Sequence, residues 1–155
     1  MDKKQVAKLG WYSIALMALT TIHHIYGSVI YNTPWRLHVL FISIPVMVLT
    51  LILQWRLVKN GSTRSGLLFW LFIFLTLLPS MGMIGVVEGL YNHVLKNLLF
   101  FGGLNTAGLQ RLFPAPTYEM PNDFLFEATG ILQGFIVIPM VVYSTKLLRS
   151  FQKTP

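Results

Sequence analysis

Four long apolar stretches dominate the 155-residue sequence and restrict the folds that it can adopt. They run approximately over residues 9–31, 37–55, 66–91 and 124–147. Each is close to the roughly 20 residues that an α-helix needs to cross a bilayer at about 1.5 Å per residue. Strands of a membrane β-barrel would be about half as long and would alternate apolar with polar residues, which these stretches do not. The sequence therefore predicts one all-α domain over residues 1–155, an integral membrane bundle of four helices.

The amino-acid composition also indicates that most of the protein's outer surface contacts lipid. Hydrophobic residues make up 54% of the chain and charged residues 11%, and a soluble domain of this size leaves too much surface in water to hide so many apolar side chains. The net charge is +7, but the basic residues lie at the ends of the apolar stretches. We therefore predict contacts with membrane lipids and no nucleic-acid partner. Cysteine is absent from the sequence, which excludes disulfides, thiolate metal sites and a cysteine nucleophile.

Lysine and arginine are unequally divided between the two ends of this predicted bundle. One end carries nine of them, namely Lys3, Lys4, Lys8, Arg56, Lys59, Arg64, Lys146, Arg149 and Lys153. The other end carries only Arg36, Lys96 and Arg111. Because basic residues beside membrane helices favour the cytoplasmic side, we predict a multi-pass protein of the cell (inner) membrane with both termini in the cytoplasm.

The third connection, approximately residues 92–123, lies on the predicted outer side and differs from the two shorter ones. It contains a sparsely charged apolar stretch at 94–101, a Gly102-Gly103 break and a second apolar stretch at 109–113. Segments of this kind commonly lie in the membrane interface. We predict an interfacial helical connection that covers the outer end of the bundle.

The same end gathers most of the ionisable residues that the apolar stretches contain. All four histidines and four of the five acidic residues are expected there: His23, His24, His38, His93, Glu88, Glu119, Asp123 and Glu127. An ionisable side chain inside a membrane is costly, so it tends to face the bundle interior and to pair or coordinate. Depth along the helices therefore predicts one polar site.

Within this site we assign His23, His24 and His93 as candidate metal ligands and Glu88 and Glu127 as candidate catalytic carboxylates. Sets of histidine and carboxylate suit Zn, Cu, Fe or Mn. The other predicted members of the polar cluster are Arg36, His38, Asn92 and Asp123. Arg36 or a histidine is the expected partner of Glu127.

The spacing of these residues along the sequence indicates a shared site less specifically than their depth along the helices does. His23 and His24 are adjacent and hence about 100° apart on an α-helix, so they are not expected to point equally well at one centre. Glu88 and Asn92 share a helical face, whereas His93 is rotated beyond it. No His-Glu-x-x-His or Glu-x-x-His pattern occurs, which argues against the familiar zinc-protease and di-iron sites.

Glycines flank both candidate carboxylates. Gly85-x-x-x-Gly89 and Gly130-x-x-x-Gly134 are small-residue motifs that let membrane helices approach closely. We therefore expect the third and fourth long helices to pack together and to bring Glu88 and Glu127 into one region.

Three functions remain open on the sequence alone. The first is a metal site that acts on a lipophilic small molecule. The second is a metal-free pocket for a lipid, sterol-like or quinone-like ligand, in which glutamate and histidine exchange protons; haem b between two histidines is a variant of it. The third is a small structural or assembly subunit, either as a homo-oligomer or in a larger membrane complex, in which the polar cluster only ties the helices together.

Overall fold

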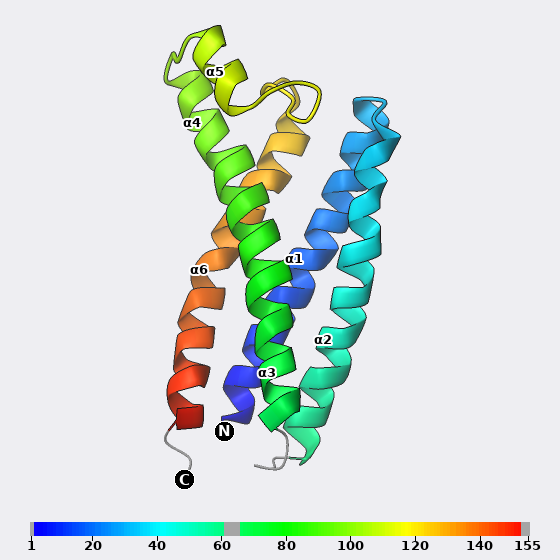
Figure 1. The fold of residues 1–155 in the computed structure, drawn as a ribbon, viewed down its shortest axis with the longest axis vertical. Helices are drawn as coiled ribbons and strands as arrows, with labels where there is room; N and C mark the ends of the chain where they lie inside the picture. The colour runs from blue at the N-terminus through cyan, green and yellow to red at the C-terminus, as the bar shows by residue number, and fades with distance from the viewer. Residues whose placement is uncertain (1, 61–65, 153–155) are drawn as a thin grey trace.

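A computed structural model describes residues 2–60 and 66–152 of the chain, and in these ranges it contains helices and no strand (Figure 1). The elements are α1 (Lys3–Ile30), the 3-10 helix η1 (Pro34–Val39), α2 (Leu40–Asn60), α3 (Gly66–Leu75), the π-helix η3 (Thr76–Leu95), α4 (Lys96–Phe101), α5 (Thr106–Leu112) and α6 (Phe124–Gln152). The prediction of an all-α bundle is confirmed.

Four of the described helical segments are long and apolar enough to cross a membrane. They are Lys3–Ile30, Pro34–Lys59, Gly66–Phe101 and Phe124–Phe151. The third is continuous from α3 through η3 to α4, so it passes well beyond the end expected near residue 91. Its polar residues lower the local hydropathy, yet Lys96 is 2% exposed and packs inside the bundle. Residues 94–101, expected in an interfacial connection, therefore belong to this long helix.

Local sequence accounts for the helix ends. The carboxylate of Asp2 caps α1 by accepting a hydrogen bond from the backbone N–H of Lys4 at 2.9 Å. Pro34 begins η1, where a missing backbone N–H costs nothing. α4 ends at the predicted glycine break, where Gly103 adopts a φ of +86° that favours glycine over other residues.

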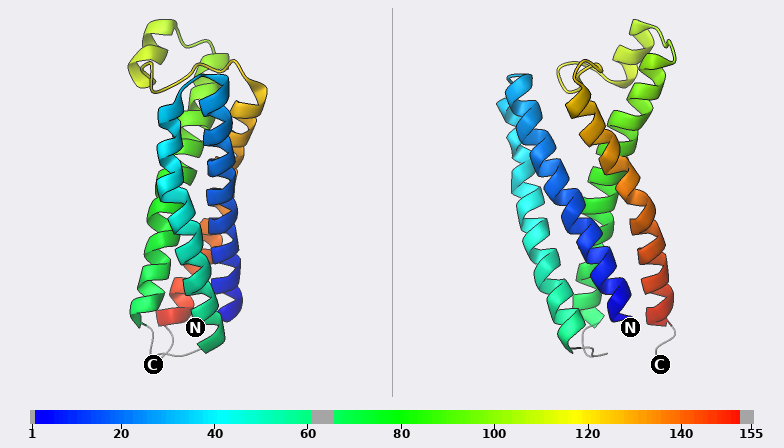
Figure 2. Two further views of the ribbon diagram at one scale, coloured as in Figure 1. Left: turned by 90° about the vertical axis from the view of Figure 1, so that its right-hand side faces the viewer. Right: turned by 180° about the vertical axis from the view of Figure 1, so that it is seen from behind.

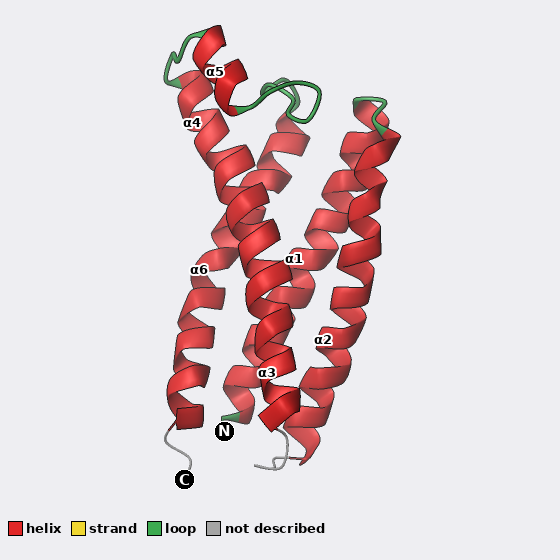
Figure 3. Cartoon of the chain, in the orientation of Figure 1, coloured by secondary structure: helices red, strands yellow, loops and turns green. Residues whose placement is uncertain are grey.

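The helices form two pairs that also contact each other. α1 packs against both α2 and α6, and α6 packs against η3. Figure 2 shows that the two termini lie at one end of the bundle and that α5 and the loop after it lie at the other. We call these the proximal and distal ends. The loops, in Figure 3, are confined to the two ends.

The interior changes in character along the bundle. Apolar side chains such as Leu9, Phe69 and Leu147 form a core toward the proximal end. Toward the distal end the buried side chains include His23, Arg36, His93, Lys96 and Glu127. The bundle thus encloses its charged groups at one end.

Glycines let η3 and α6 meet, as the motifs predicted. A Cβ atom added to Gly89 would overlap the backbone of Gly134. This close approach places the residues that follow Glu88 directly against the first turns of α6.

Candidate metal centre

His23 reaches the distal interior from α1 and is completely buried. Its Nδ1 atom lies 2.9 Å from Oγ1 of Thr129 on α6, and its ring stacks on Phe126 at a centroid distance of 4.1 Å. The Thr129 hydroxyl donates to the carbonyl of Leu125 at 2.8 Å, so it accepts a hydrogen bond from Nδ1 of His23. That arrangement leaves Nε2 of His23 to face Glu88, and Nε2 has no hydrogen-bond partner among the described residues.

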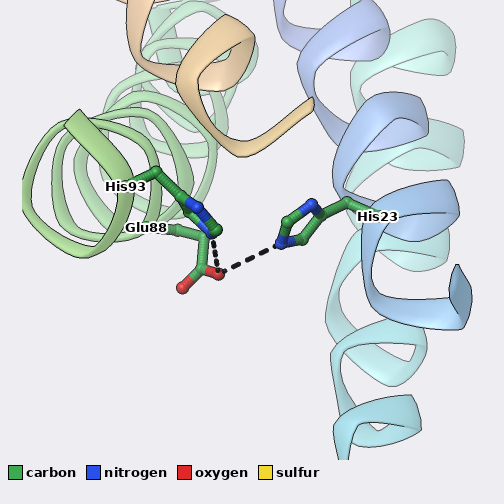
Figure 4. Close-up of side chains that lie close together, drawn as sticks. All are labelled: His23, Glu88 and His93. Atoms are coloured by element: carbon green, nitrogen blue, oxygen red, sulfur yellow. Dashed lines mark ion pairs between the residues drawn. The ribbon is translucent and has the colours of Figure 1, made fainter. Parts of the chain in front are cut away.

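Glu88 and His93 come from η3, and its π-helical winding brings them together. Residues five apart lie about 140° from each other on an α-helix, so His93 was expected to rotate away from Glu88. In η3 the backbone bonds span five residues, as in the bond from Lys96 N–H to the Tyr91 carbonyl, and residues five apart therefore share a face. The two side chains point at the same region in Figure 4, opposite His23.

One oxygen atom is the centre of this arrangement. Oε1 of Glu88 lies 3.6 Å from Nε2 of His23, 3.6 Å from Nε2 of His24 and 3.5 Å from Nε2 of His93. The other oxygen, Oε2, accepts a hydrogen bond of 2.7 Å from Asn92. We call His23, His24, Glu88 and His93 the His/Glu cluster. His23 and His24 both approach this oxygen, but the set of residues that could hold one metal ion contains His23 and not His24.

The distances suit coordination better than hydrogen bonding. An N–H···O bond normally spans about 2.7–3.2 Å, which is shorter than the three N···O separations. Two donor atoms that each lie about 2.0–2.1 Å from a tetrahedral ion are about 3.4 Å apart. The ligand atoms of His23, Glu88 and His93 all lie within 4.8 Å of one another. The two N···O separations, from Glu88 to His23 and to His93, are therefore close to a tetrahedral edge, and the three residues could hold a metal ion between them.

Glu127 is not part of this set of ligand atoms but forms a hydrogen bond with the ring of His93. Its Oε2 accepts a hydrogen bond of 2.8 Å from Nδ1 of His93, and its Oε1 accepts one of 2.9 Å from Nζ of Lys96. Asn97 also donates to Oε2. A carboxylate in this position fixes the tautomer of a metal-binding histidine so that Nε2 carries the free lone pair. Glu88 and Glu127 are thus linked through the ring of His93, and the predicted histidine partner of Glu127 is present.

The tautomers assigned to His23 and His93 leave two lone pairs facing one carboxylate oxygen. The two nitrogen lone pairs and the negatively charged oxygen repel one another unless a positive charge lies between them. Protons on the imidazoles or a single metal ion would each supply that charge. The separations of 3.5–3.6 Å fit an ion pair with a protonated imidazole as well as a bridging metal ion.

A cavity of about 320 Å³ adjoins the cluster. His24, Glu88 and His93 line it, together with residues of η1, the start of α2 and the loop at 117–119. This volume is at the lower end of the range for small-molecule pockets. Burial raises the pKa of the Tyr118 phenol on this wall, and the charges of Tyr91 and Glu88 act in the same direction.

The remaining predicted residues lie around the cluster in other roles. His38 is exposed and its Nδ1 lies 2.6 Å from the Trp35 carbonyl. Asp123 caps α6 by accepting from the backbone N–H of Phe126 at 2.8 Å. Arg36 is buried near Glu119, with 3.6 Å between Nη2 and Oε1. None of the three contacts Glu88 in the hydrogen bonds and ion pairs of the described residues, whereas Asn92 does.

Three functional neighbours were absent from the sequence-based assignment: Lys96, Asn97 and Thr129. Lys96 and Asn97 fell outside the expected third span, although their spacing of three and four residues from His93 was a usable signal. Thr129 carried no signal, because one threonine in an apolar helix is common.

No protein-family model, curated protein or solved structure matches this chain.

Proposed function

We propose that this chain is a multi-pass protein of the cell membrane whose His/Glu cluster binds a transition metal and acts on a lipophilic substrate. Its four apolar helices would cross the bilayer, with both termini on the cytoplasmic side and the cluster near the outer surface. One observation supports the metal proposal: Oε1 of Glu88 lies 3.6 Å from Nε2 of His23 and 3.5 Å from Nε2 of His93, and both separations are close to the edge of a tetrahedral site.

Zn²⁺ suits the cluster best among the candidate metals. Two histidines and one glutamate form the ligand set of several catalytic zinc sites, which keep a further position open. A similar set with more open positions binds Fe(II) in oxygenases, but octahedral ligands sit closer together, at about 3 Å for bonds near 2.1 Å. The separations of 3.5–3.6 Å therefore favour tetrahedral Zn²⁺.

The position of the cavity supports catalysis over a purely structural metal. Glu88 and His93 form part of its wall, whereas His23 does not. An ion held by these residues would have its open side toward the cavity. There Zn²⁺ would act as a Lewis acid on a carbonyl or phosphoryl oxygen and would activate water. His24, on the same wall and 3.6 Å from Glu88, is placed to exchange a proton or to bind as a fourth ligand.

Metal content tests the proposal directly. The protein would be purified in mild detergent, loaded separately with Zn²⁺, Cu²⁺, Fe²⁺ or Mn²⁺, desalted and assayed by mass spectrometry for metal per chain. We expect about one Zn²⁺ per chain in the wild type and loss of it in His23→Ala and His93→Ala. His38→Ala is the matched control, because this exposed histidine lines the same cavity and has no ion pair with Glu88 among the described residues. Folded wild-type protein that retains none of the four metals would overturn the proposal and favour protonated histidines.

Membrane insertion is supported by the distribution of side chains. Large apolar residues such as Phe41, Leu67 and Phe135 are exposed on the outer faces of the helices, while charged residues are buried inside. Water would disfavour both features and lipid favours both.

The absence of cysteine makes the orientation easy to measure. Single cysteines introduced at Lys3 and at exposed Gln110 would be labelled in intact cells with a membrane-impermeant maleimide. We expect labelling at Gln110→Cys and protection at Lys3→Cys until the cells are lysed. The reverse pattern would contradict the predicted orientation, and labelling of both in intact cells would contradict a closed barrier between them.

A further inference from the structure

We infer that the cavity beside the His/Glu cluster binds a single-chain amphiphile with a carboxylate head group, which reaches it sideways from the lipid between α2 and η3. This inference rests on the proposed function for its membrane setting.

The cavity is polar at its distal end and apolar toward the middle of the bundle. Its charged or titratable side chains include His24, Arg36, Glu88, His93, Lys96 and Glu119. Its apolar side chains include Val39, Ile42, Pro79, Met83, Ile84 and Val87. Since η1–α2 and η3 run in opposite directions, the two groups separate along the bundle on both walls, as the chain order in Figure 1 shows. A ligand that fits this gradient has a polar head and an apolar tail.

The apolar part of the cavity has an open side. Ile42 on α2 is 38% exposed, and Met83 and Val87 on η3 are 49% and 51% exposed. These residues belong both to the cavity wall and to the apolar outer surface. A tail that lies between them can continue into surrounding lipid, so it need not fit within the 320 Å³ of the cavity. A volume this small favours one chain over the two of a phospholipid.

Arg36 favours an anionic head group. Its guanidinium lines the cavity and is 5% exposed, and Nη2 has no hydrogen-bond partner among the described residues. The nearest carboxylate oxygen, Oε1 of Glu119, is 3.6 Å from Nη2, too far for a hydrogen bond. Lys96, in contrast, is satisfied by Glu127 and by the Glu119 carbonyl. A buried guanidinium with an unused donor is suited to a carboxylate.

Photo-crosslinking in lipid nanodiscs tests the inference. A long-chain fatty acid with a diazirine in its tail would be bound to the wild-type protein and irradiated, and the labelled residues would be identified by mass spectrometry. We expect labelling at Ile42, Met83 and Val87 that excess oleate prevents. A fatty alcohol with the same diazirine should label them much less, because it has no carboxylate for Arg36.

Two variants distinguish specific binding in the cavity from non-specific contact with lipid. Arg36→Gln should weaken oleate competition roughly tenfold, the order expected for a hydrogen bond to a charged group. Val87→Phe should obstruct the tail, whereas Val86→Phe is the matched control on an exposed neighbour outside the cavity wall. Labelling that oleate does not reduce, or that Val87→Phe leaves unchanged, would overturn the inference.

Metal content measured on the same samples distinguishes this inference from the proposed function. Bound Zn²⁺ without competable labelling would overturn the amphiphile site alone. Competable labelling without any metal would overturn the metal site and leave the amphiphile site standing.

Discussion

Glu127 holds the ring of His93 on the side opposite Glu88. Its Oε2 lies 2.8 Å from Nδ1, while Oε1 of Glu88 lies 3.5 Å from Nε2. Thr129 holds His23 in the same way, at 2.9 Å from its Nδ1. α6 therefore supplies no ligand to the His/Glu cluster but orients two of its histidines.

Replacing Glu127 should weaken metal binding and destabilise the fold. We expect Glu127→Gln to lower Zn²⁺ affinity about 10–100-fold, as loss of an outer carboxylate does in metal sites. It also leaves the buried Lys96 ammonium without its carboxylate, which should cost about 3–5 kcal/mol in the free energy of unfolding. Chelator competition measures the first effect and denaturation in detergent the second.

The double variant Lys96→Met/Glu127→Gln separates these effects, because neither charge is then left alone. It should recover stability while its Zn²⁺ affinity stays low. If affinity recovers as well, Glu127 does not orient His93.

The hydroxyl of Thr129 should matter for metal binding more than for stability. Thr129→Val keeps the shape of the side chain but removes the acceptor for Nδ1 of His23, so we expect about tenfold weaker Zn²⁺ binding. Thr145→Val is the matched control on α6, because that exposed hydroxyl donates only to the backbone carbonyl of Val141. Equal Zn²⁺ dissociation constants for the two variants would contradict the positioning role.

Gly130 should tolerate no side chain. A Cβ there would overlap the ring of His93, so Gly130→Ala must push the ring or the helix aside. We expect a loss of about 1–3 kcal/mol in the free energy of unfolding, the usual cost of overpacking, together with loss of bound Zn²⁺. Gly66→Ala, where no atom of the described residues lies within 4 Å of the added Cβ, serves as control and should keep both properties. Full metal content in Gly130→Ala would show that His93 is not confined as described.

Tyr118 should make stability fall at alkaline pH. Its folded pKa is raised above the ordinary value of 10.0, first by burial and then by the neighbouring Tyr91 and Glu88. Above pH 10 the unfolded chain loses this proton before the folded chain does, so the contribution is present below pH 10 and is lost as the pH rises through the folded pKa. The free energy of unfolding of the wild type should therefore decline more steeply above pH 10 than that of Tyr118→Phe. Parallel pH profiles would contradict the raised pKa.

Much of the fold could be predicted because hydropathy and spacing are local properties. A run of about 20 apolar residues is a helix wherever it packs, and paired glycines permit close approach whichever helix they meet. The depth of a residue along its helix follows from counting, so His23, Glu88, His93 and Glu127 could be placed at one end from the sequence.

The interaction partners of these residues could not be predicted from the sequence. Lys96 was placed in the interfacial helical connection, and only the contact of α4 with α6 identified its carboxylate. The shared face of Glu88 and His93 depends on the π-helical register of η3, which the residue pattern did not reveal.

The sequence alone therefore determined four apolar helices and a common depth for the polar residues, since both depend on neighbours along the chain. The tertiary structure alone decided that three imidazole nitrogens meet one oxygen of Glu88 and that α6 orients the rings of His23 and His93. The physical reason is that helix rotation and register are set by contacts between distant segments. A shift of one residue in either would turn these side chains away from one another.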